Sequence, residues 1–75
     1  MTTLMWEARA AEGRLDDLVA YAAEHADPSA LIFRSDEPDP RLVVIDPSGH
    51  GISEVPEYLV ARAPHVWPFE RVQRT

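Results

Sequence analysis

The sequence predicts a small α+β domain with one four-stranded antiparallel sheet and two helices, in the ferredoxin-like order β-α-β-β-α-β. The spacing of apolar residues switches between a period of two and a period of 3.6 along the chain, and turn-forming residues stand at the switches. Several strands are also apolar on both sides, which predicts a sheet that is covered on both faces. The 75 residues, 1–75, make a single domain.

The first part of the chain predicts a strand followed by a helix. Residues 4–10 alternate between two faces, as in a strand. Gly13 ends this pattern, and over 14–26 the apolar residues recur at the spacing of an amphipathic helix. Asp-Pro-Ser at 27–29 ends the helix. The apolar stripe of the helix consists of Leu15, Leu18, Val19, Ala22 and Ala26.

The middle of the chain predicts a β-hairpin. Residues 30–34 and 41–45 are apolar runs, and the link at 35–40 is rich in turn formers and short enough to join antiparallel strands. In both runs three consecutive residues are apolar, at 31–33 and at 43–45, so both faces of these strands are apolar. A second copy of the sheet would cover the face that the helices leave free, and we therefore expect a homodimer.

The last part predicts a loop, a short helix and an edge strand. The loop spans 46–51, and Ser53 is a plausible N-cap for a helix over 54–62. The final strand covers 65–72. Because Pro68 has no backbone N–H, this strand is expected at an edge of the sheet or at a bulge.

Composition and charge exclude several classes of function. The formal net charge is −6, which repels phosphate backbones, so neither nucleic acid nor an anionic membrane surface is expected as a partner. There is no Cys, so disulfides and thiolate zinc sites are excluded. No apolar run spans a membrane and the first residues do not resemble a signal peptide, so we expect a cytoplasmic protein. All seven basic residues are Arg, a bias that a GC-rich bacterial genome would produce.

Four residues are candidates for a site. His65 precedes the last strand and is the candidate catalytic base, because an imidazole beside apolar walls can titrate near neutrality. Trp6, Tyr58 and Trp67 are candidate ligand-binding residues, since the first and last strands are neighbours in this topology; the alternative is that these aromatic residues form the core. No histidine pair has metal-site spacing and no nucleotide-binding glycine motif occurs, so neither a metal nor a cofactor is expected.

Three segments carry a resemblance to a known group: the opening strand at 4–9, the helix start at 13–18 and the closing run at 64–69, Pro-His-Val-Trp-Pro-Phe. With these, the element pattern of nearly the whole chain resembles the dimeric α+β barrel superfamily, to which the antibiotic-biosynthesis-monooxygenase-like proteins belong. The resemblance implies a homodimer with two sheets face to face, and a small hydrophobic ligand between sheet and helices. Some members are cofactor-independent monooxygenases or isomerases.

Two hypotheses about function remain open. The first is a small homodimeric module that binds a small hydrophobic ligand or a protein partner. The alternative is a cofactor-independent monooxygenase or isomerase acting on a hydrophobic, polyketide-like substrate. An enzyme needs an enclosed cavity with a convergent polar group, and the sequence does not decide between the two.

Overall fold

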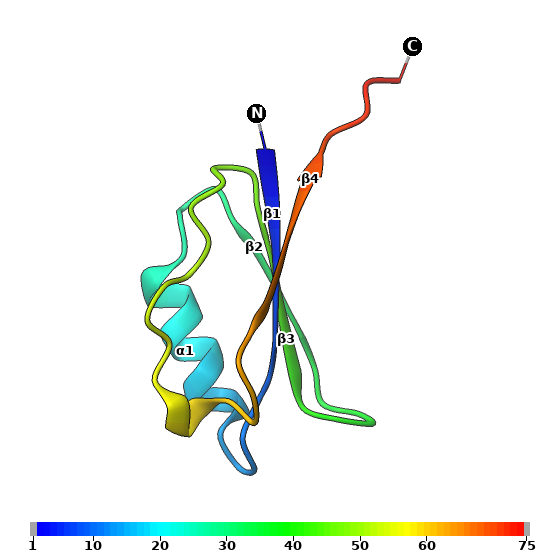
Figure 1. Ribbon diagram of the computed structural model, residues 1–75. Coiled ribbons are helices and arrows are strands. Elements are labelled where there is room, and N and C mark those ends of the chain that lie inside the picture. The colour runs from blue at the N-terminus through cyan, green and yellow to red at the C-terminus, as the bar shows by residue number, and fades with distance from the viewer. Residues whose placement is uncertain (1, 75) are drawn as a thin grey trace.

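The computed structural model describes residues 2–74, and its strands form one antiparallel sheet in the order β2-β3-β1-β4 (Figure 1). The α+β class and the four-stranded antiparallel sheet are therefore confirmed. The first and last strands are neighbours, and Pro68 lies in an edge strand, both as expected. The elements are β1 (Thr2–Arg9), α1 (Leu15–His25), β2 (Leu31–Ser35), β3 (Arg41–Asp46), the 3₁₀ turn η1 (Glu57–Leu59) and β4 (His65–Glu70).

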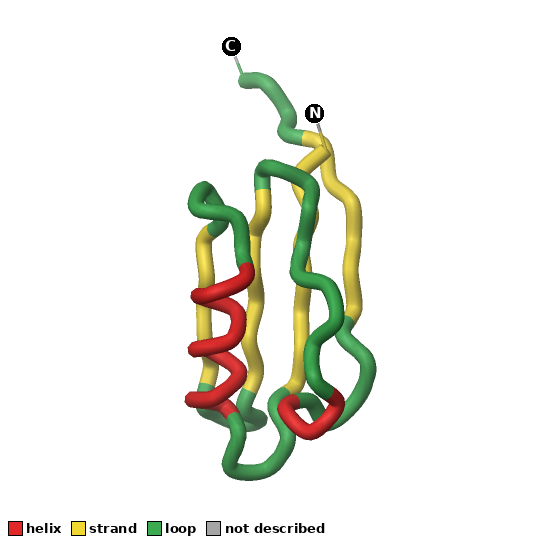
Figure 2. Tube along the Cα trace, turned by 90° about the vertical axis from the view of Figure 1, so that its left-hand side faces the viewer, coloured by secondary structure: helices red, strands yellow, loops and turns green. Residues whose placement is uncertain are grey.

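One face of the sheet is covered by two pieces of chain. Helix α1 lies over β2 and β3, and the segment between β3 and β4, which includes η1, runs over the other half of the same face (Figure 2). Within residues 2–74, no segment covers the opposite face (Figure 1). No helix among these residues is long and apolar enough to cross a membrane.

The core lies between the sheet and this covering layer. In β3 the residues alternate between fully and partly buried, and Leu42 and Val44 are among the fully buried ones. Trp6 stands directly opposite Val44 in the register, so both point toward the same side. Helix α1 buries its apolar stripe against them. The buried members of that stripe are Leu15, Leu18 and Ala22.

The predicted second helix over 54–62 is wrong, because only Glu57–Leu59 forms a single 3₁₀ turn. Glu54 has a left-handed φ of 57°, and Pro56 has an extended ψ of 134°, so the chain is not helical just before the turn. After the turn it pairs with the end of β1: the amide of Ala61 donates to the Arg9 carbonyl at 2.8 Å. The segment makes its backbone hydrogen bonds with the residues at the end of β1 instead of within a helix.

Candidate functional site

The uncovered face of the sheet, called the open face below, is mainly apolar across all four strands. The register places Met5 between Ile45 and Trp67, and Phe33 opposite Val43. Folded monomers rarely expose a contiguous apolar patch larger than a few hundred Å², and larger patches mark binding surfaces. The apolar residues of this face are Met5, Leu31, Phe33, Val43, Ile45, Trp67 and Phe69.

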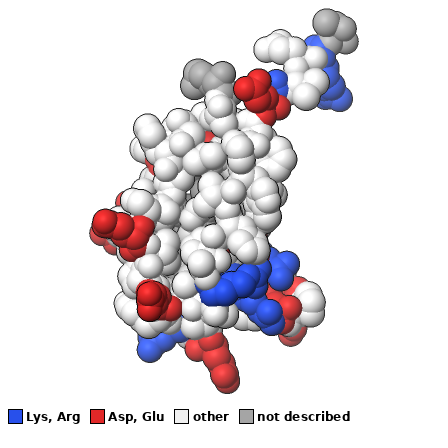
Figure 3. Space-filling view, in the orientation of Figure 1, with Lys and Arg blue, Asp and Glu red and all other residues white. Residues whose placement is uncertain are grey.

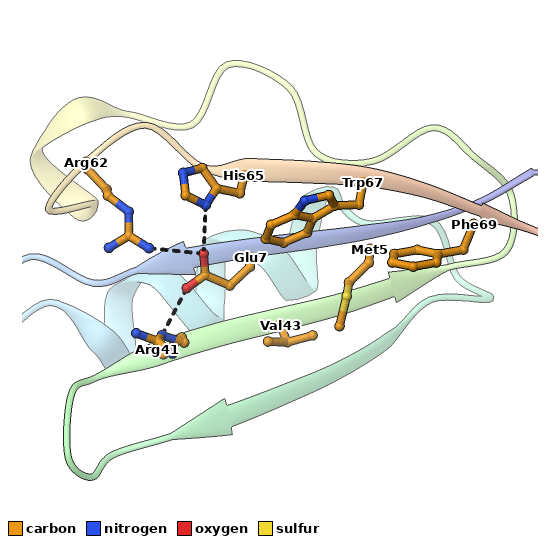
Figure 4. Close-up of a pocket in the computed structure, with 8 residues that line it drawn as sticks. All are labelled: Met5, Glu7, Arg41, Val43, Arg62, His65, Trp67 and Phe69. Carbon is orange, nitrogen blue, oxygen red and sulfur yellow. Dashed lines mark hydrogen bonds and ion pairs between the residues drawn. The ribbon is translucent and has the colours of Figure 1, made fainter.

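A hollow of about 470 Å³ lies on the open face, over β1, β3 and β4 (Figure 4). One end of the hollow is apolar and the other is charged. The apolar lining is Met5, Val43, Trp67 and Phe69, and the charged or titratable lining is Glu7, Arg41, Arg62 and His65.

Glu7 is the centre of the charged end. It lies on the central strand β1, between Val43 and His65 in the register, and is only 8% exposed. Its Oε2 is 2.9 Å from Nε of Arg41, and its Oε1 accepts a hydrogen bond from Nη2 of Arg62 at 3.3 Å. The Nδ1 of His65 is 3.8 Å from the same Oε1. A carboxylate that is taken out of water needs such partners, because burying it alone costs several kcal/mol.

The contact between Glu7 and Arg41 is a close ion pair but not an aligned hydrogen bond. Within residues 2–74, neither Oε2 of Glu7 nor Nε of Arg41 has a hydrogen-bond partner, although both atoms are buried. The side chains of Arg41 and Arg62 are still 43% and 39% exposed. Both guanidinium groups therefore keep donors that can reach a ligand in the hollow.

Two of the four predicted site residues lie together in this hollow. His65 and Trp67 both line it, with their rings edge to face and their centroids 5.5 Å apart. Trp6 lies on the opposite face, 1% exposed, because Trp67 pairs with Met5 and not with Trp6. Tyr58 is on η1, 64% exposed, with the Arg14 guanidinium 5.4 Å from its ring. The predicted grouping of Trp6, Tyr58, His65 and Trp67 in one pocket is therefore wrong, and Trp6 belongs to the core.

Sequence reasoning missed Glu7, Arg41 and Arg62. One signal for Glu7 was present, because it is a charge between Trp6 and Ala8 in a strand that is otherwise apolar in its middle. Its parity places it on the side of Met5. A carboxylate in the middle of a central strand requires cations nearby, and these come from β3 and from the chain before β4.

The position of the hollow also differs from what the resemblance implied. The space between sheet and helix is filled by fully buried side chains, whereas the hollow is on the other side of the sheet. The side chains that fill that space include Trp6, Leu18, Leu42, Val44 and Leu59.

The charged end of the hollow can bind anions and accept protons. Two guanidinium groups present donors, and the imidazole of His65 stands beside a carboxylate that can orient it. Among residues 2–74, no group of three His, Asp or Glu side chains could hold a metal ion.

Comparisons with protein-family models, with curated proteins and with solved structures found no match. The function is therefore argued from the geometry of the open face.

Proposed function

We propose that the protein is a small homodimeric module that binds a mainly apolar small molecule in the hollow of the open face, which a second copy of the chain covers. The observation that carries this proposal is a buried, paired carboxylate, Glu7, at the charged end of a sheet face that is mainly apolar and bare.

The size and character of the open face favour a second copy as its cover. Phe33, Trp67 and Phe69 are about half exposed, and each presents on the order of 100 Å² of aromatic surface. Together with the aliphatic residues of the face they form the apolar centre that an interface of about 800 Å² per partner needs. Two sheets packed face to face at about 10 Å interdigitate such side chains.

The placement of charge is compatible with a two-fold axis. The ion pairs of the open face lie at the end that holds Glu7, whereas the other end, around Leu31, Ile45 and Phe69, is apolar. A two-fold axis through the apolar end would keep the charged clusters of the two protomers apart. The apolar patch of one protomer would then pack against the same patch of its partner. The strand order β2-β3-β1-β4 supports the ferredoxin-like arrangement. Two such sheets packed face to face would form a dimeric α+β barrel.

A covering sheet would also enclose the hollow. Ligand sites have volumes of about 300–1,000 Å³ and bury most of the ligand's surface, with a few polar groups that orient it. The hollow of about 470 Å³, with an apolar end and a charged end, falls within this range. The second sheet would supply the missing wall.

His65 is the one observation that favours the enzymatic alternative. Its imidazole lies 3.8 Å from Glu7 and could move a proton in an isomerisation. Ligand binding needs an apolar lining and a few polar groups that orient the ligand, and the hollow has both. Catalysis also needs a group placed to act on the reacting atoms, and the position of His65 beside Glu7 is the single observation for that role. Ligand binding is therefore the function that the geometry favours.

Light scattering on a matched pair of variants tests the proposal. Phe33 is 55% exposed in the edge strand β2, so Phe33→Asp is expected to leave the protomer folded and to convert a dimer into a monomer. Tyr58→Asp is the control, because it places the same charge at a similarly exposed aromatic residue on the other face of the sheet. This variant is expected to remain a dimer.

Circular dichroism establishes that both variants are folded. A wild-type protein that is monomeric at micromolar concentration would contradict the proposal. Loss of the dimer in Tyr58→Asp and its retention in Phe33→Asp would place the interface on the other face and contradict it equally.

A further inference from the structure

We infer that the ligand of the hollow is a monoanion, an apolar body with one acidic group that Arg41 and Arg62 bind. This inference rests on the proposed function of the open face and specifies its ligand class.

The charges at this end of the open face do not balance. Within residues 2–74, the ion pairs of Arg9, Arg41 and Arg62 are made with Glu7 and Asp39 alone, and Nη2 of Arg9 is 2.7 Å from Oδ1 of Asp39. One positive charge is therefore uncompensated when His65 is neutral, in a chain whose net charge is −6. In the space-filling view, arginine side chains gather beside a broad stretch without charged residues (Figure 3).

The arrangement of arginines is costly without a further anion. Arg9 and Arg41 stand directly opposite each other on β1 and β3, which is an unfavourable pairing of like charges. Asp39 compensates Arg9, but Glu7 serves Arg41 and Arg62 together. A ligand carboxylate or sulfonate would supply the second negative charge.

The donors needed for that anion are present and free. A guanidinium has five N–H donors. Among the described residues, Arg62 uses one donor on Glu7, and Arg41 makes only the unaligned contact through Nε. The two groups approach Glu7 from different elements, at the same end of the hollow (Figure 4). Glu7 holds both side chains in place, so an anion could bind without breaking a contact within the protein.

The apolar end of the hollow indicates the chemical character of the rest of the ligand. Met5, Val43, Trp67 and Phe69 continue from the charged end along the sheet and offer contacts to a flat hydrocarbon body. A neutral apolar molecule gains this burial but leaves the arginine donors unused, whereas an acid of the same shape gains both. The site should therefore distinguish the acid from its uncharged counterpart.

A pair of fluorescent probes tests this difference. Anilinonaphthalene sulfonate has an apolar body with one anionic group, and phenylnaphthylamine is the same body without the sulfonate. We expect the wild-type protein to bind the sulfonate at least about tenfold more tightly. The preference should weaken as salt is raised, because exposed charges are screened.

Variants of the arginines show which side chains cause the preference for the sulfonate. Arg41→Met and Arg62→Met are each expected to weaken binding of the sulfonate about tenfold and to leave phenylnaphthylamine unchanged. Arg34→Met is the matched control, because it removes the same charge from a side chain that pairs with Asp16 and Asp36, away from the hollow. Circular dichroism verifies that the variants are folded.

The outcomes separate this inference from the proposed function. Equal affinity of the wild-type protein for both probes would overturn the anion inference and leave an apolar site. If Arg34→Met weakens binding of the sulfonate as much as Arg41→Met and Arg62→Met do, the anion inference is also overturned. The overall charge of the protein would then explain the preference, and no local site would be needed. If neither probe binds, the ligand inference fails, while light scattering still decides on the dimer.

Discussion

The two buried carboxylates of the described chain, Glu7 and Asp46, are compensated in different ways. Asp46 lies at the end of β3 and accepts hydrogen bonds from the amides of Ser48 at 2.9 Å and Gly51 at 2.7 Å, as well as from the Ser48 hydroxyl. Its partners are fixed parts of one loop. Glu7 depends on half-exposed arginines that keep free donors. Asp46 is therefore a structural residue, and Glu7 organises a site.

Asp46→Asn is expected to lower the free energy of unfolding by about 1–3 kcal/mol at neutral pH, because an amide cannot serve all three donors as a carboxylate does. Burial opposes ionisation, but the hydrogen bonds from Ser48 and Gly51 outweigh it and lower the pKa of the Asp46 carboxyl below 3.8. A lowered pKa contributes stability above 3.8, which is lost as the pH falls through the folded-state value. The difference in free energy of unfolding between wild type and variant, measured by urea denaturation, should therefore become smaller below about pH 4.

The chain contains a natural control for this prediction. Asp27-Pro28-Ser29 repeats the sequence of Asp46-Pro47-Ser48, and Asp27 likewise accepts hydrogen bonds from the amide and hydroxyl of Ser29. Asp27 is more exposed than Asp46, and within residues 2–74 its carboxylate accepts no third hydrogen bond, since Nδ1 of His50 is 3.9 Å from its Oδ1. Asp27→Asn should therefore lower the free energy of unfolding by less than Asp46→Asn does. An equal loss of stability in both variants would show that neither the burial of Asp46 nor its hydrogen bond from Gly51 adds to its contribution.

At the scale of elements, periodicity predicted the regular pieces and failed on the irregular one. The alternation at 4–10 and the stripe over 14–26 are long enough to indicate β1 and α1 within two residues at each end. The segment 54–62 is short, and the helical spacing of Val55 and Leu59 within it is one that a loop produces equally well. Its backbone pairs with the end of β1, a tertiary contact that no local pattern reveals.

Although η1 is a single turn, Leu59 is 2% exposed and packs in the core with the residues of α1. Leu59→Ala is expected to lower the free energy of unfolding by about 2–5 kcal/mol, as it does for a buried leucine in a regular helix. The loss depends on how deeply the side chain is buried, and not on whether the backbone is helical. Tyr58→Ala, at the exposed neighbouring position, removes only the contact with the Arg14 guanidinium and should change stability by less than about 1 kcal/mol. Urea denaturation compares the two, and equal small losses would mean that the turn does not contribute to the core.

At the scale of the whole molecule, the sequence revealed the open face but not its site. Consecutive apolar residues at 31–33 and 43–45 indicated a sheet that is apolar on both sides, and Val43 and Val44 indeed lie on opposite faces. The site depends on register, since a shift of one residue separates Trp6 from Trp67. It also depends on Arg62, which is 55 positions from Glu7 in the chain. Neither the strand register nor such a long-range contact can be predicted from the spacing of residues along the chain.

The stability of the molecule should depend on its concentration if the open face is covered by a second copy. Dissociation of a dimer on unfolding makes the midpoint of thermal unfolding rise with protein concentration, and a hundredfold increase, from about 1 to 100 µM, should raise it by about 5–10 °C. Phe33→Asp, which removes the interface, should unfold at one temperature throughout that range, whereas Tyr58→Asp should follow the wild type. Scanning calorimetry measures all three. A wild-type midpoint that is independent of concentration would show that the protomer is stable by itself, and the exposed aromatic residues of the open face would then need another partner.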